Sequence, residues 1–111
     1  MPTYITQGRY TRDAIKGMIV RPEDRADAVA RLLTKVGGRL VAYYVTFGEY
    51  DFLCIGDAPN DVQMAAALFA AGSGGGVTDL RTTVALTSIE AKGALAAASD
   101  LAPGFKSAGG A

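Results

Sequence analysis

Two strand-like segments separated by only three residues set the strongest limit on how this chain can fold. Residues 39–47 and 51–57 are rich in Val, Ile, Leu, Phe and Tyr, and Gly48-Glu49-Tyr50 connects them. Parallel strands need a crossover connection of a dozen or more residues, so these segments cannot run parallel to each other. They are therefore predicted to form an antiparallel hairpin.

Strands and helices flank this hairpin in a regular order. Residues 2–10 and 77–87 alternate with the two-residue period of a strand. Helical spacing of apolar residues predicts helices over residues 12–19, from Pro22 to about residue 36, over 61–71 and over 88–100. The order β-α-β-β-α-β plus a terminal helix is that of the ferredoxin-like plait, an α+β fold with a four-stranded antiparallel sheet and two helices on one face.

Polar and small residues mark the ends of these helices. Thr11 and Asn60 are predicted N-caps, and the segment from Thr87 to Glu90 has the pattern of a capping box. Pro22 either begins a second helix or breaks one longer helix. The run Gly72 to Gly76 leaves a helix instead of entering one and lacks the Gly-Lys-Ser/Thr of a phosphate loop, so it is predicted to be a flexible connector.

The sheet face that no helix covers is predicted to be partly apolar. Leu53 and Ile55 alternate with Phe52 and Cys54, so both faces of this strand carry apolar side chains. Sheet-to-sheet packing of two chains would remove the open face from water. We therefore expect a homodimer or a larger homo-oligomer, with the last helix extending the interface through Ala91, Leu95 and Ala98.

The composition excludes several classes of site. The chain has no His, no Trp and one Cys. Within one chain this excludes Ser-His and Cys-His catalytic pairs, His-ligated metals and haem, and Cys-ligated zinc or iron–sulfur centres. We accordingly expect no metal and no cofactor. Cys54 is expected to act as a small inward-facing apolar residue.

Length and charge indicate the number of domains and the kinds of partner that the chain can have. The chain of 111 residues fits one domain, predicted over 1–101 with a flexible tail over 102–111. Eleven basic and eleven acidic residues give a formal net charge of zero, which argues against general nucleic-acid binding. No apolar run is long enough to span a membrane, and the first residues lack a signal-peptide pattern. We expect a reduced, cytoplasmic protein.

The order of short motifs resembles the GYD domain family, which is named after a Gly-Tyr-Asp motif. Here the motif reads Gly48-Glu49-Tyr50-Asp51, with a glutamate inside it, and it is followed by an apolar strand and the helix start Ala58-Pro59. The resemblance runs from Pro2 to about Glu90. It implies a plait of the dimeric α/β-barrel type and little about activity, because the family is largely uncharacterised.

A more distant likeness is to the ligand-binding domain of the feast-or-famine transcription regulators. The shared features are the Gly-x-Tyr-Asp hairpin, an Asp-initiated helix and Gly76-Val77 before the last strand. Those domains bind amino acids at subunit interfaces. This chain lacks their DNA-binding helix-turn-helix, so the likeness implies at most a stand-alone sensor domain.

Candidate ligand-binding residues gather around the predicted hairpin and the sheet. They are Tyr44, Gly48, Tyr50, Asp51 and Arg81. The tyrosines either pack on the sheet or hold a planar ligand, and Asp51 either caps turn N–H groups or pairs with an amine. Arg81 either recognises a carboxylate or forms an ion pair with Asp51 or Asp79. Gly48 allows an unusual backbone angle at the turn.

Three functions fit these observations. The first is a module that binds or senses a small metabolite at a subunit interface near the hairpin. The second is a cofactor-independent, monooxygenase-like enzyme acting on an aromatic molecule, in which Asp51, Tyr44 or Arg81 would deprotonate or orient a phenol. The lack of His counts against this enzyme, because it leaves no base poised near neutral pH. The third is a structural oligomerisation subunit.

Overall fold

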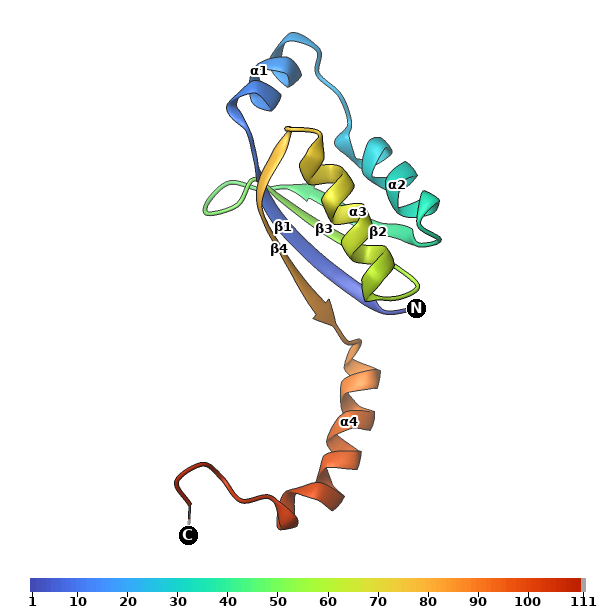
Figure 1. The fold of residues 1–111 in the computed structure, drawn as a ribbon, viewed down its shortest axis with the longest axis vertical. Coiled ribbons are helices and arrows are strands. Elements are labelled where there is room, and N and C mark those ends of the chain that lie inside the picture. Colours follow the sequence, from blue (N-terminus) through green and yellow to red (C-terminus); the bar gives the residue numbers. More distant parts are fainter. Residues whose placement is uncertain (111) are drawn as a thin grey trace.

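The sheet and its covering helices have the predicted α+β plait. A computed structural model describes residues 1–110. The strands β1 (Thr3–Tyr10), β2 (Arg39–Val45), β3 (Phe52–Asp57) and β4 (Val77–Ala85) form one antiparallel sheet in the order β2-β3-β1-β4. The remaining elements are α1 (Arg12–Val20), α2 (Arg25–Lys35), α3 (Asp61–Ser73), α4 (Ser88–Leu101) and the short 3-10 helix η1 (Ala102–Gly104) (Figure 1).

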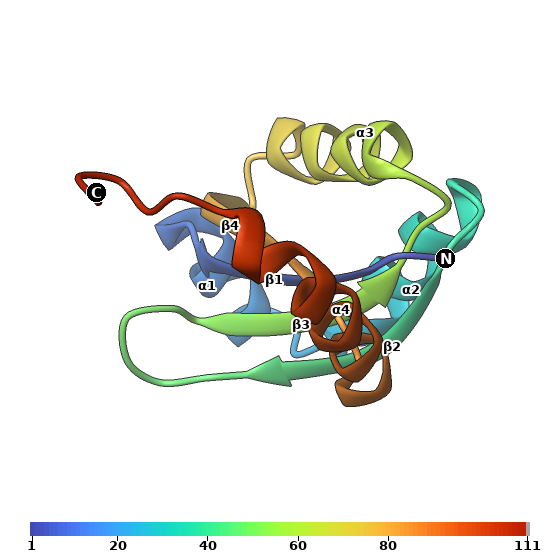
Figure 2. The same ribbon diagram turned by 90° about the horizontal axis from the view of Figure 1, so that it is seen from below.

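Two helices cover one face of the sheet, each over a different edge. Helix α2 packs along β2 and α3 along β4, and these are the two edge strands (Figure 2). The buried core between helices and sheet consists of Tyr4, Leu33, Cys54, Ala58, Met64 and Ala67. The hydroxyl of Tyr4 donates to Asp61 Oδ1 at 2.6 Å, which ties β1 to the first turn of α3.

The predicted helix caps at Thr11, Asn60 and Thr87 are confirmed. Thr11 Oγ1 accepts from the N–H of Ala14 at 3.2 Å, and Asn60 Oδ1 accepts from the N–H of Gln63 at 2.9 Å. Thr87 and Glu90 bond reciprocally, as a capping box requires. Each cap satisfies a backbone donor that the first turn of a helix leaves free.

The start of the second helix differs from the prediction. Two separate helices form, and α2 begins at Arg25, not at Pro22. The reason is Asp24, whose Oδ1 accepts from the N–H of Ala26 at 3.0 Å and so takes the N-cap position. Pro22 lies in the connection between α1 and α2.

The hairpin is antiparallel, as predicted, but its strands are shorter. Tyr44 pairs with Leu53, while β2 ends at Val45 and β3 begins at Phe52. The connection is closed by Thr46, whose N–H donates to the Asp51 carbonyl at 2.8 Å and whose hydroxyl donates to the Tyr50 carbonyl at 2.7 Å. Beyond the last β2–β3 pair, Val45 and Phe52, these two hydrogen bonds of Thr46 hold the ends of the hairpin together.

Helix α4 stands away from the compact body. The chain leaves the sheet at the end of β4, and Figure 1 shows α4 projecting beyond it. None of its residues is buried, and Ile89, Leu95 and Leu101 are each more than 70% exposed. The sequence places α4 inside a domain of residues 1–101, whereas the compact body ends at β4. The tail predicted over 102–111 begins with η1, and its last residue, Ala111, lies outside the described residues.

No helix within residues 1–110 combines the length and the apolar character needed to span a bilayer.

Replacing Asp57 with Asn is expected to lower the free energy of unfolding by about 1–2 kcal/mol near neutral pH. Asp57 is only 7% exposed, and its carboxylate accepts from Thr3 Oγ1 at 2.7 Å and from Arg39 Nε at 2.9 Å. Both hydrogen bonds lower the pKa of the Asp57 carboxyl, and the bond from Thr3 lowers it more than the bond from Arg39. Arg39 is mostly exposed, so its ion pair with Asp57 contributes little to the free energy of unfolding.

The sign of the pH dependence follows from that lowered pKa. A depressed native pKa stabilises the fold above the unfolded pKa of about 4, and this stabilisation is lost as pH falls further. Urea unfolding at several pH values should therefore show the difference between wild type and Asp57→Asn shrinking below about pH 4. A difference that grows toward low pH would contradict this assignment.

Candidate functional site

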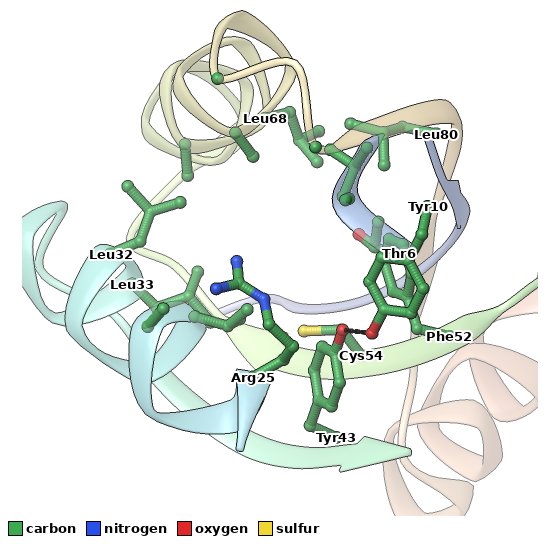
Figure 3. A pocket seen from close by; sticks show the side chains of 18 of the residues that line it. Thr6, Tyr10, Arg25, Leu32, Leu33, Tyr43, Phe52, Cys54, Leu68 and Leu80 are labelled. Atoms are coloured by element: carbon green, nitrogen blue, oxygen red, sulfur yellow. Dashed lines mark hydrogen bonds between the residues drawn. The ribbon is translucent and has the colours of Figure 1, made fainter. Parts of the chain in front are cut away.

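A cavity of about 590 Å³ lies between the helices and the covered face of the sheet (Figure 3). Its volume falls within the range of about 300–1,000 Å³ that small-molecule sites occupy. Residues from α1, α2, α3 and all the strands of the sheet line it. The cavity is thus walled by a single chain and lies on the helix-covered face, whereas the sequence pointed to a pocket between subunits near the hairpin.

Small residues on the facing helices explain why this space is not filled. Ala14, Gly17, Ala28, Ala67 and Ala71 all line the cavity. Helices α2 and α3 sit over opposite edges of the sheet, so side chains this short leave a gap between them. Larger apolar side chains then form its wall: Met18, Val29, Leu32, Leu33, Met64, Leu68 and Leu80.

An aromatic cluster forms one side of the cavity. The centroid of the Phe52 ring lies 5.2 Å from that of Tyr10 and 5.8 Å from that of Tyr43. The planes of the Phe52 and Tyr43 rings are 8° apart, so these two rings are stacked. The hydroxyls of Tyr10 and Tyr43 hydrogen-bond to each other. Gly8 makes room for this cluster, because a Cβ there would come within 2.7 Å of Phe52 Cζ and of Leu80 Cδ2.

The titratable groups of the cavity floor stay protonated near neutral pH. Burial raises the pKa of the Cys54 thiol to about 11. Burial also raises the pKa of the Tyr43 phenol, and its hydrogen bond with Tyr10 adds to the rise. A protonated thiol and a protonated phenol are neither nucleophile nor general base. Cys54 thus packs as the small apolar residue that the sequence predicts.

Charged side chains line one end of the cavity, and Arg25 is the one drawn in Figure 3. Arg25, in the first turn of α2, points its guanidinium into the space above Leu33 and Tyr43 (Figure 3). Its side chain is 33% exposed, and its Nη1 donates to Glu23 Oε2 at 3.1 Å. Arg21 also lines the cavity. The α1–α2 connection and the start of α2 therefore supply two cations and one anion to this end of the cavity.

The predicted residues of the hairpin lie outside the cavity and make contacts at the end of the sheet. Gly48 has a φ of 135°, the unusual backbone angle expected of it. Asp51 Oδ2 accepts from the N–H of Tyr10 at 2.9 Å, so Asp51 caps the end of β1. The guanidinium of Arg9 lies 5.0 Å above the Tyr50 ring. Gly48 has the predicted backbone angle, whereas Asp51 caps the N–H at the end of β1 and not the turn N–H groups that the sequence suggested. A ligand-binding role for Gly48, Tyr50 and Asp51 stays a prediction.

Tyr44 and Arg81 project from the open face and do not meet within one chain. The strand register aligns Tyr44, Leu53, Gln7 and Arg81 in one row across the sheet. Tyr44 and Arg81 stand on its two edge strands, about 14 Å apart at usual strand spacing. A ligand could contact both only if it spanned the sheet or if another chain brought them together.

The predicted ion pair of Arg81 with Asp51 or Asp79 is wrong. Asp51 is bonded to the backbone of Tyr10, and Asp79 pairs instead with Arg9 at 3.2 Å. The reason is a register shift after Gln7 together with the positive φ of 53° at Asp79. Among residues 1–110, Arg81 has no ion pair.

Sequence reasoning did not single out Arg25. The available signal was its place in the apolar stripe of α2, since Arg25, Val29 and Leu32 follow helical spacing and all line the cavity. An arginine in line with core residues either extends its charge past them into water or points it at something buried.

Metal binding finds no support in the described part of the chain. No group of three or more Cys, Asp and Glu side chains there lies close enough together to hold an ion.

Comparison with known proteins identifies similar chains. The family model of the GYD domain matches residues 4–95. A Thermus thermophilus protein named "Glutamine synthetase and cystathionine beta-lyase binding protein" is 31% identical over 77 residues, which span 69% of this chain and 81% of the relative.

Two solved structures are similar to this chain. The crystal structure of TTHA0845 from Thermus thermophilus matches with a TM-score of 0.52 at 16% identity, covering 79% of this chain and 96% of that one. The crystal structure of hypothetical protein PHS023 from Pyrococcus horikoshii matches at 14% identity over 79% of this chain and 93% of that one, with a TM-score of 0.48. The match to TTHA0845 shows a shared fold.

The native Cys54 thiol is expected to react with iodoacetamide roughly 100-fold more slowly at about pH 8 than the same thiol in unfolded protein, because a pKa raised to about 11 leaves far less thiolate. Mass spectrometry of timed samples, with and without urea, measures both rates. Equal rates in the two samples would show that the native thiol carries as much thiolate as the unfolded one, which contradicts a raised pKa of Cys54.

Proposed function

The chain belongs to the GYD domain family, whose model matches residues 4–95, and we propose that it holds a small molecule in the cavity between its helices and its sheet. The observation that carries this proposal is the cavity itself. It is large enough for a metabolite, its wall is mostly apolar, and its few polar groups lie at defined places.

The chemistry of the cavity favours binding over catalysis. An enzyme acting on a phenol needs a base close to its substrate. Tyr43 and Cys54 are held protonated by burial. Asp51, the candidate base, is bonded to the backbone at the end of β1, outside the cavity. Binding without turnover is therefore the better account of these residues.

Contact with other proteins is a second proposed role. The open face of the sheet carries Ile5, Leu53, Ile55 and the exposed ring of Tyr44. Helix α4 adds exposed apolar side chains with no covering element. A relative is named for binding two enzymes. We propose that a second copy of the chain covers the open face and α4, because a homo-oligomer removes both surfaces from water at once.

Saturable binding of the neutral fluorescent probe N-phenyl-1-naphthylamine tests the cavity. Wild type is expected to bind the probe, and Ala71→Trp is expected to weaken binding by at least about tenfold, because Ala71 lines the cavity and an indole would occupy the space. The matched control is Ala66→Trp, which lies exposed on the same helix and outside the cavity. Equal affinity in both variants would place the probe elsewhere and refute the proposed site.

The molar mass of the protein in solution tests whether two or more chains associate through the open face and α4. Light scattering behind size exclusion is expected to give a multiple of the 11.4 kDa chain mass for wild type. Leu53→Lys should shift the equilibrium toward monomer, because its side chain lies on the open face. Deleting residues 88–111 should weaken association as well. Wild type that stays monomeric at micromolar concentration would end this proposal.

A further inference from the structure

We propose that the cavity binds an apolar carboxylic acid, with Arg25 and the hydroxyl pair of Tyr10 and Tyr43 holding the carboxylate end and the aliphatic wall holding the carbon skeleton. This inference rests on the proposed function and names the chemical class of its ligand. Three observations support it: the supply of hydrogen-bond donors, the free capacity of Arg25 and the shape of the apolar wall.

Apart from Glu23, the polar side chains that line the cavity can donate hydrogen bonds, and the tyrosine hydroxyls have a proton to spare. The two hydroxyls of Tyr10 and Tyr43 hold two protons, and only one of them lies in the bond between the rings. Thr6 also lines the cavity, and its hydroxyl shares a hydrogen bond with Thr82, which is not part of the lining. Cys54 stays a thiol, a weak donor. A ligand that offers acceptors therefore satisfies these groups better than a ligand that offers donors.

Arg25 adds a positive charge with unused capacity. Of its five N–H groups, one bonds to Glu23, and within the described residues the guanidinium makes no other hydrogen bond. The guanidinium points into the cavity from the first turn of α2, and its charge opposes the rise in the pKa of the Tyr43 phenol. A planar guanidinium binds a carboxylate through two parallel hydrogen bonds, so an acid is its natural ligand.

A cationic ligand fits this cavity less well. Glu23 is the acidic side chain in the lining, it is about half exposed, and it is already paired with Arg25. Arg21 adds a second positive charge at the same end. An amine would meet two cations and one engaged carboxylate, whereas a carboxylate would meet a net positive charge.

The rest of the lining requires an apolar skeleton. Leu32, Leu68, Met18 and Leu80 line the cavity from three helices and a strand. Polar groups along the ligand would lose their water there without gaining partners. An acid with a hydrocarbon or aryl body matches this division between a polar end and an apolar wall.

Competition experiments separate the acid from its neutral analogue. Octanoate and 1-octanol share a chain length and differ in charge, and each would displace N-phenyl-1-naphthylamine from wild type. We expect octanoate to compete about tenfold or more better than 1-octanol, the preference that a charge-assisted pair supplies. Arg25→Gln should abolish this preference, because it should weaken competition by octanoate much more than competition by 1-octanol.

Matched variants make the result specific to Arg25. Arg31→Gln removes an exposed cation from the same helix outside the cavity and should keep the preference for octanoate. Arg25→Lys keeps the charge without the planar fork and should retain part of it. Loss of the preference in Arg31→Gln would show that general charge, not Arg25, attracts the acid.

The outcomes distinguish this inference from the proposed function. If the probe binds in the cavity but octanoate and 1-octanol compete equally, or neither competes, the carboxylate inference is wrong and the cavity remains a binding site. A preference for octanoate that persists in Arg25→Gln also overturns the inference. If Ala71→Trp and Ala66→Trp bind the probe equally, the proposed function itself fails.

Discussion

The alternation of side chains along β1 and β3 is the constraint on which the rest of the molecule depends. It sends Tyr4, Thr6 and Cys54 toward the helices and leaves Ile5 and Leu53 on the opposite face. A one-residue change of register would exchange these two sets, placing apolar core residues in water. One face of the sheet can therefore hold a ligand cavity, while the other is left for contact with another chain.

The cavity exists because the helices that cover the sheet are spaced apart and present small side chains. Ala28 on α2 and Ala71 on α3 face a gap that neither can fill. Inside it, low polarity keeps Cys54 and Tyr43 protonated, so the same burial that builds the pocket removes its nucleophile and base. The hydroxyl donors lie in the same cavity as Arg21 and Arg25, and this suits recognition of an acceptor more than covalent chemistry.

Helix α4 and the open sheet face both leave apolar side chains exposed to water. A helix of 14 residues with no buried side chain gains little from packing and keeps its apolar residues in water. The open face adds Leu53 and Ile55 at the sheet centre. The proposed self-association would offset the cost of both exposures, and it would leave the cavity on the other face of each chain free to bind.

Local patterns in the sequence determined the elements, the hairpin, the caps at Thr11 and Thr87 and the division of each strand into two faces, because these depend on neighbouring residues and on the two-residue period of a strand. The start of α2 was missed because Asp24, two residues after Pro22, provides the N-cap. Tertiary structure alone decided the site. The cavity depends on how far apart α2 and α3 stand, and the partner of Asp79 depends on a shift between strands distant in sequence. Such distances are set by packing, which residue spacing along one chain does not encode.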